Sequence, residues 1–164
     1  MEFARSKHNK IKDELAKFLR KKFGDHTVFT EKSHSLPNNT WKFMDIYVDL
    51  GSNALIIEVK SPWDADRKFN DAYTRACDDC LDVELRLLER HYKNEVKIFH
   101  FVIGSLGRWH KDNDSLLHAI GWNDDEVKTY ATRVAKRNIE MCAKHFSRHL
   151  LYISNEEIIR DGTA

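Results

Sequence analysis

Two runs of strand-forming residues lie so close together that they constrain the fold more than any other feature of this sequence. Residues 40–50 and 54–60 are both rich in β-branched and aromatic side chains. Only Gly51, Ser52 and Asn53 separate them, and a connection this short joins antiparallel neighbours. The sequence therefore predicts a β-hairpin.

The other elements follow from the spacing of apolar residues. The predicted helices cover residues 8–25 (with Gly24 as the stop), 63–92, 115–122 and 124–153, and further strands cover 26–32 and 96–104. The strand 96–104 is apolar enough to lie centrally in a sheet. The long last helix is predicted to turn Val127, Ala131, Val134, Met141 and Phe146 inward. No repeat or linker is visible, so we expect one α/β domain over residues 1–164, with a mixed β-sheet flanked by helices.

Composition indicates a folded globular chain. Of its 164 residues 41% are hydrophobic and 32% charged, with a net charge of +1. No apolar stretch is long enough to span a membrane, and no signal-peptide pattern opens the chain. Three cysteines, an odd number, give no disulfide framework, so we expect a reducing compartment.

Strand alternation brings three charged side chains of the hairpin toward one patch. Alternation places Asp45 on the face of Tyr47, opposite Met44, and it places Glu58 and Lys60 together on the second strand. One strand register makes Asp45, Glu58 and Lys60 converge. Burial of the opposite aliphatic faces favours that register.

These residue types suit a metal-dependent reaction on phosphate. Two carboxylates held close together raise each other's pKa unless a cation intervenes. Proteins usually hold Mg²⁺ through one or two carboxylates, waters and phosphate oxygens, so Asp45 and Glu58 are predicted ligands, with the Val59 carbonyl as a third. The ion would lower the pKa of a bound water and neutralise charge on a phosphodiester. Lys60 would orient that water or balance negative charge.

The same residues also have an ordinary structural explanation. Glu-x-Lys occurs often by chance, and a surface hairpin can carry a simple Glu58–Lys60 ion pair beside solvated aspartates. Asp49 lies about 13 Å from Asp45 along an extended strand, so we expect it to end the strand rather than to bind metal. The combination with Asp45 and a preceding helix bearing Glu14 favours the metal site.

Asp45, followed after twelve intervening residues by Glu58-Val59-Lys60, resembles the signature of the PD-(D/E)xK, or restriction-endonuclease-like, superfamily. Other segments resemble, in the family's order, the endonuclease domain of non-LTR retrotransposons. They are Lys7-His8-Asn9, IIEVKSPWD (56–64), FVIGSLGRWHKDNDSLLHAIGW (101–122) and FSRHLLY (146–152). The resemblance covers about residues 7–152.

The resemblance implies a Mg²⁺- or Mn²⁺-dependent endonuclease that nicks double-stranded chromosomal DNA, with Asp45, Glu58 and Lys60 as catalytic residues. The exposed 3′-hydroxyl would prime reverse transcription of the element's RNA. The chain carries no reverse transcriptase, so its implied partners are the rest of a retrotransposon polyprotein and that RNA. The implied location is the nucleus, and no membrane is implied.

The chain departs from the family pattern at three points. Met44 stands where a proline is usual before the aspartate, and the upstream zinc knuckle is absent. Many relatives carry a small hydroxyl residue at the position of Lys60 and a lysine on the following helix. Here that helix offers Arg75 and no lysine in DAYTRACDDC (71–80), so we expect Lys60 to act.

Two residues of the first helix are candidate accessory groups. His8 lies on its apolar side, where it could contact phosphate, cap the helix or join the site. Glu14 is offset from the apolar stripe and could either reach the metal or be solvated.

A zinc site is a weaker possibility. Cys77 and Cys80 form C-x2-C, and His145 and His149 form H-x3-H. Nothing in the sequence brings the two pairs together, so buried thiols and solvated histidines are the commoner outcome. His100, in the strand 96–104, is expected to be a satisfied sheet histidine.

DNA binding requires positive charge near the site. Arg67 and Lys68 follow the catalytic strand, and Arg108, Trp109 and Lys111 follow a glycine-containing loop. We expect this loop to contact the DNA backbone, with Trp109 stacking or wedging.

Two other functions are compatible with these residues. A stand-alone Holliday-junction resolvase predicts a stable dimer and a preference for branched DNA. A catalytically idle nucleic-acid-binding domain predicts DNA binding without cleavage.

Overall fold

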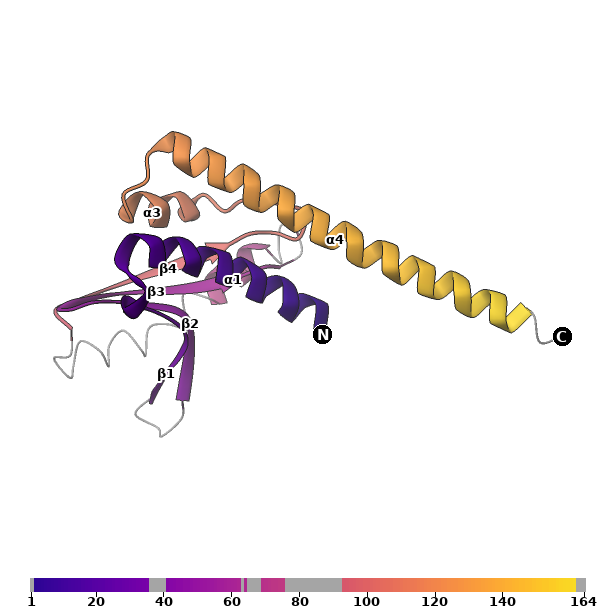
Figure 1. Ribbon diagram of the computed structural model, residues 1–164, viewed down its shortest axis with the longest axis horizontal. Coiled ribbons are helices and arrows are strands. Elements are labelled where there is room, and N and C mark those ends of the chain that lie inside the picture. Colours follow the sequence, from indigo (N-terminus) through magenta and orange to yellow (C-terminus); the bar gives the residue numbers. More distant parts are fainter. Residues whose placement is uncertain (1, 36–40, 63, 65–68, 76–92, 162–164) are drawn as a thin grey trace.

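The structure is a computed structural model, and it describes residues 2–35, 41–62, 64, 69–75 and 93–161 (Figure 1). Its elements are α1 (Glu2–Phe23), the 3₁₀ turn η1 (Asp25–Thr27), β1 (Val28–Ser35), β2 (Trp41–Leu50), β3 (Asn53–Lys60), β4 (Glu95–Val102), α3 (Asp112–Ala119) and α4 (Asp124–Asp161). Residues 69–75 are also helical, within the predicted helix 63–92. The prediction of an α/β fold with a mixed sheet and flanking helices is confirmed.

The four strands form one sheet in the order β1-β2-β3-β4. β1 pairs antiparallel with β2 and β2 antiparallel with β3, which confirms the predicted hairpin. β4 pairs parallel with β3. Among the described residues β4 ends the strand order, so the expectation that it lies centrally is wrong. Its exposed residues Glu95 and Lys97 suit an edge.

The main core lies between one face of the sheet and the helices α1, α3 and α4, which lie on the same side of it (Figure 1). α1 contributes Ile11, Leu15 and Leu19, spaced by four residues along one helical face. Gly24 ends this helix with a positive φ of 96°, a conformation that glycine adopts without steric cost. The predicted stop is therefore confirmed.

A second, smaller apolar cluster covers the opposite face of the sheet. It contains Tyr47 and Ile56, which stand opposite each other in the β2–β3 register, with Ala54 and Val96. Met44 also packs here, although strict alternation predicts it on the face opposite Tyr47. The alternation of β2 is therefore interrupted close to Asp45.

The inward face of α4 is Val127, Tyr130, Val134, Asn138 and Cys142, all buried. Val127 and Val134 were predicted correctly.

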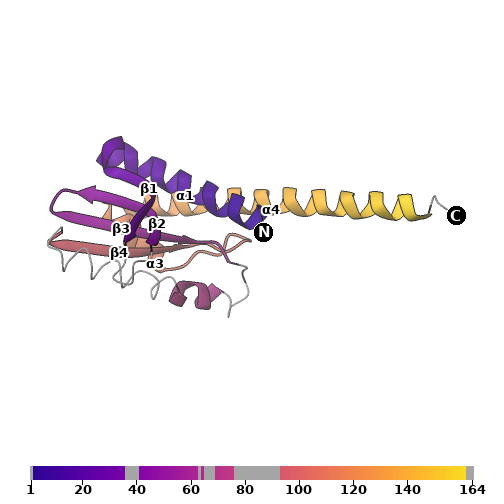
Figure 2. The same cartoon turned by 90° about the horizontal axis from the view of Figure 1, so that it is seen from below.

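Phe146 was predicted to point inward and is instead 43% exposed. Both views show that α4 extends beyond the sheet and the other helices (Figures 1 and 2).

No helix among the described residues is long and apolar enough to cross a bilayer.

Candidate active site between β2 and β3

The regular pairing of β2 with β3 gives way to side-chain contacts at the position of two acids. The paired register runs from Leu50–Asn53 to Ile46–Ile57. Beyond it, the backbone N–H of Asp45 donates to Oε1 of Glu58 (3.3 Å), and the N–H of Val59 donates to Oδ2 of Asp45 (2.8 Å). Each carboxylate thus binds the other strand, which holds the two acids face to face.

α1 supplies a third group to this site. Nε2 of His8 lies 3.1 Å from Oδ2 of Asp45 and 3.0 Å from the carbonyl oxygen of Val59. A hydrogen bond to Asp45 and the charge of that carboxylate raise the pKa of His8 despite partial burial. The site therefore favours a positively charged group between Asp45 and the Val59 carbonyl.

The two carboxylates have opposite electrostatic environments. Burial alone would raise the pKa of Asp45, but the hydrogen bond and charge of His8 outweigh it and lower that pKa. Burial and the charge of Asp45 raise the pKa of Glu58, whose side chain is only 4% exposed. Unequal environments of this kind are typical of functional sites.

Lys60 completes the predicted set. Its Nζ lies 3.5 Å from Oε2 of Glu58, and its side chain is 31% exposed. It stands on β3 two residues after Glu58 and so shares its face. The structure thus brings Asp45, Glu58, Val59, Lys60 and His8 together.

The donor atoms fit a hard divalent cation. A carboxylate oxygen of Asp45, the carboxylate of Glu58 and the Val59 carbonyl are all oxygen ligands, the type that Mg²⁺ and Mn²⁺ take. The raised pKa of Glu58 reflects negative charge that a cation would stabilise. The described residues contain no cluster of three or more His, Cys, Asp and Glu side chains placed to hold a metal. The predicted set relies on two carboxylates and a carbonyl, and Mg²⁺ usually completes its shell with water and phosphate.

Glu14 lies away from this group. Its carboxylate is 2.7 Å from Nη1 of Arg137 and 3.4 Å from Nε of Arg133, both on α4. Its position six residues after His8 turns it to another side of α1. The structure therefore gives Glu14 a place between two helices rather than beside Asp45.

Trp109 packs against the main core. Its ring meets Phe101 and Tyr130 edge to face, at centroid distances of 5.3 and 6.4 Å, and its Nε1 donates to Asp114. The predicted stacking of Trp109 on bases needs a ring that faces solvent, and this ring packs against the core.

Arg108 connects the loop after β4 to Asp64 and Phe69. Its Nη1 donates to the carbonyl of Asp64 (3.2 Å), and its guanidinium lies 4.6 Å from the centre of the Phe69 ring. Lys111 is exposed at the start of α3. The predicted DNA-contacting residues Arg67 and Lys68 lie outside the described residues.

The zinc hypothesis gains no support. Cys77 and Cys80 lie outside the described residues, as does the side chain of His149, and His145 is exposed.

Asp49 forms an ion pair with Lys93 and does not join Asp45, as expected of a residue at the end of a strand.

His100 stands opposite Glu58 in the β3–β4 register. Its buried Nδ1 has no hydrogen-bond partner among the described residues, so the expectation that it is satisfied is wrong. Burial and the charge of Lys60 lower its pKa.

A buried polar cluster beside the site was not predicted. Nζ of Lys7, on a residue only 3% exposed, donates to the hydroxyl of Ser105. Asn138 donates to the carbonyl of Gly104, and the thiol of Cys142 to the carbonyl of Ser105. The cluster fixes the N-terminal part of α1, and with it His8, to the loop after β4. Lysine and asparagine give no signal of burial in a single sequence.

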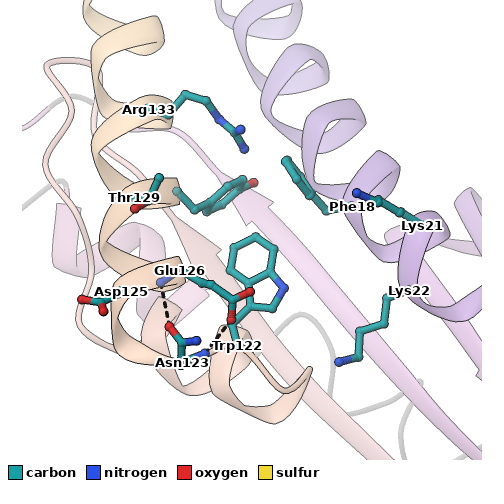
Figure 3. A pocket seen from close by; sticks show the side chains of 10 residues that line it. Phe18, Lys21, Lys22, Trp122, Asn123, Asp125, Glu126, Thr129 and Arg133 are labelled. Atoms are coloured by element: carbon teal, nitrogen blue, oxygen red, sulfur yellow. Dashed lines mark hydrogen bonds between the residues drawn. The ribbon is translucent and has the colours of Figure 1, made fainter.

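A separate pocket of about 560 Å³ lies between α1 and α4 (Figure 3). Phe18 of α1 points toward Trp122 across it, with ring centroids 5.5 Å apart, and the guanidinium of Arg133 lies 4.7 Å from the Phe18 ring. Phe18 follows His8 by ten residues, or about 15 Å along α1. The pocket is therefore distinct from the acidic site.

Comparison of the chain with models of known protein families gives no match, and no curated protein matches it.

Proposed function

We propose that this chain is a metal-dependent endonuclease that hydrolyses phosphodiester bonds of DNA. The observation that carries the proposal is the convergence of Asp45 and Glu58, each bound to the other's strand, with the Val59 carbonyl and Lys60 beside them. Neither a solvated hairpin nor an isolated ion pair requires two acids to face each other with one of them almost fully buried.

Each residue of the site would have a separate role in the reaction. Asp45, Glu58 and the Val59 carbonyl would hold the cation, and a bound divalent ion supplies a Lewis acid and acidifies a coordinated water. Lys60 carries its ammonium group beside Glu58, where it can orient an attacking water and balance negative charge on the phosphate. The strands β2 and β3 fix these groups rigidly, as positioning requires.

The proposal extends to the fold and to the biological role. A mixed sheet with an acidic hairpin and flanking helices is compatible with a restriction-endonuclease-like core. The narrower role, in which a nick in chromosomal DNA primes reverse transcription, is supported by the order of the resembling segments. It would make the rest of a retrotransposon polyprotein and its RNA the partners of this chain.

A plasmid assay tests the chemistry. We expect the parent chain to convert supercoiled DNA to nicked circles in Mg²⁺ or Mn²⁺ and not in EDTA. Asp45→Asn, Glu58→Gln and Lys60→Ala should each lower the rate about 100-fold or more, since each removes a group that stabilises the transition state.

Matched controls come from the same sheet. Asp49→Asn removes an aspartate of β2 that pairs with Lys93, and Lys97→Ala removes an exposed lysine of β4. Both should cleave like the parent. Metal-dependent nicking that survives Asp45→Asn would show that the site has been assigned to the wrong residues.

A further inference from the structure

His8 faces two of the oxygen groups that are proposed to hold the cation. Its Nε2 lies 3.1 Å from Oδ2 of Asp45 and 3.0 Å from the carbonyl oxygen of Val59. Both distances are those of hydrogen bonds. One side chain of α1 therefore contacts two of the three proposed metal ligands at the same time.

The partners of Nε2 determine what this nitrogen does. A carboxylate and a backbone carbonyl accept hydrogen bonds and have no hydrogen to donate. Of the two forms in which a histidine nitrogen occurs, only the one that carries a hydrogen can bond to such atoms. Nε2 of His8 must therefore be a donor, and its N–H is shared between Asp45 and the Val59 carbonyl.

A donor hydrogen and a metal ion compete for the same lone pairs. Divalent cations bind carboxylate and carbonyl oxygens through these lone pairs. Oδ2 of Asp45 already accepts from two groups, the N–H of Val59 at 2.8 Å and Nε2 of His8. An N–H that points at both oxygens also repels a cation, because its hydrogen carries partial positive charge. The imidazole in this position therefore opposes an ion that binds both oxygens.

The surroundings of His8 allow its side chain to move but not its helix. The side chain is 27% exposed, so part of the ring borders solvent. The neighbouring Lys7 is fixed inside the molecule by its hydrogen bond to Ser105. Ile11 and Leu15, further along α1, are buried in the main core. A rotamer change of a partly exposed side chain is fast, whereas a shift of α1 would disturb close packing. Displacement of His8 would therefore be a rotation of its side chain.

We propose that His8 competes with the metal ion: its imidazole holds Asp45 and the Val59 carbonyl until a divalent cation displaces it toward solvent. The inference rests on the proposed nuclease function, because it takes these oxygens as metal ligands. While His8 is in place, its donor offsets negative charge that Asp45 and Glu58 bring close together. The contact thus lowers the affinity for metal and sets the metal concentration at which the site fills.

Metal binding by the full chain, without DNA, tests this inference. Free Mn²⁺ is measured by its electron paramagnetic resonance signal, and Mg²⁺ binding by calorimetry. We expect His8→Ala to bind each ion about 10- to 100-fold more tightly than the parent, the range given by loss of one hydrogen bond to a charged group. The same variant should be less stable to denaturant in EDTA, because it loses its contacts to Asp45 and Val59. A residue with a merely structural role would lose stability without a gain in affinity.

Three further variants make the comparison specific. His8→Asn carries a shorter side chain and should also bind metal more tightly, so the test does not depend on one substitution. His26→Ala removes an exposed histidine of η1 and should leave the affinity unchanged. Asp45→Asn removes a proposed ligand and should abolish binding, which identifies the measured ion as the one at this site.

The outcomes separate this inference from the proposed function. Equal metal affinity of the parent and His8→Ala, with binding still abolished by Asp45→Asn, would overturn the inference and keep the proposed active site. Weaker binding by His8→Ala would also overturn it and would mark His8 as a metal ligand. Binding that ignores Asp45→Asn, or no binding by any of these chains, would reject the proposed site and the inference with it.

Discussion

Glu58 is a carboxylate in surroundings that oppose its charge. Its side chain is almost fully buried on β3, and both burial and the nearby Asp45 raise its pKa. A group whose pKa is raised on folding stabilises the protein at low pH, and this contribution is lost as the pH rises through its folded-state pKa. At neutral pH and without metal, the ionised Glu58 is therefore a cost, of the kind retained at functional sites.

We predict that Glu58→Gln stabilises the metal-free protein at pH 7 by about 1 kcal/mol while it lowers the rate of cleavage about 100-fold or more. Urea unfolding in EDTA measures the first effect. Adding Mg²⁺ should raise the stability of the parent, because ligands stabilise the state that binds them, and should not raise that of the variant. Glu95→Gln, at an exposed position of β4, is the control. A variant less stable than the parent would contradict this account.

The pair of His8 and Asp45 gives a second prediction, on pH. The raised pKa of His8 adds stability fully present below about pH 6.5 and lost as the pH rises through its folded-state value. The lowered pKa of Asp45 adds stability above about pH 4, lost as the pH falls further. The contribution of the pair is therefore largest between these limits.

In metal-free buffer, His8→Gln should cost about 1 kcal/mol near pH 5 and progressively less toward pH 8.5. Denaturant unfolding of parent and variant across this range measures the difference. A cost that does not change with pH would mean that packing, not charge, holds His8.

Local sequence determines some features of the fold and not others. The β2–β3 hairpin could be predicted because three residues connect two strands, and apolar faces then fix the register that joins Asp45 to Glu58. The position of β4 at the edge of the sheet could not be predicted, because a parallel pairing follows a long connection that carries no register signal.

Helical periodicity has a similar limit. It identified α1 and α4, yet it could not show that Glu14 meets Arg137, 123 residues away in sequence. Trp109 was predicted to be an exposed ring, whereas it packs against the core and Trp41 is the tryptophan that is 63% exposed. Burial of an aromatic residue depends on which elements pack over it, and a single sequence does not contain that information.

The loop after β4 is packed tightly against the segment that follows β3. A Cβ added at Gly104 would lie 1.8 Å from Oδ1 of Asp64, and the other oxygen of that carboxylate accepts from the N–H of Leu106. Gly104→Ala should therefore cost about 1–3 kcal/mol through overpacking.

Chemical denaturation measures this cost, and a double variant tests its cause. Gly104→Ala combined with Asp64→Ala should cost less than the sum of the two single changes, because the clash is absent. Gly51→Ala, where no atom lies within 4 Å of the added Cβ, is a control without a clash, and any cost there comes from its positive φ, which Gly104 does not share. Strict additivity would contradict the predicted clash.

Helix α4 divides into a packed part and a projecting part. Among the α4 side chains that the structure describes, Cys142 is the last buried one and residues 143–148 are all exposed. The helix then continues away from the sheet (Figures 1 and 2). Since packing supplies most of the stability of a helix in a protein, a chain that ends at residue 148 should unfold within about 0.5 kcal/mol of the parent.

Val134→Ala, on the packed part, should cost about 2 kcal/mol in the same unfolding experiment. A truncated chain that loses as much as this variant would show that the projecting part is packed in solution.

The amide of Val59 can serve as a spectroscopic probe of the acidic site because of its hydrogen bond. It donates to a carboxylate, Oδ2 of Asp45, where a neighbouring strand would normally offer a carbonyl. Its ¹H–¹⁵N resonance should therefore report the charge and ligands of Asp45 directly. A magnesium titration followed by NMR, without any DNA, would read the affinity of the centre from this one peak, even in a chain that never turns over.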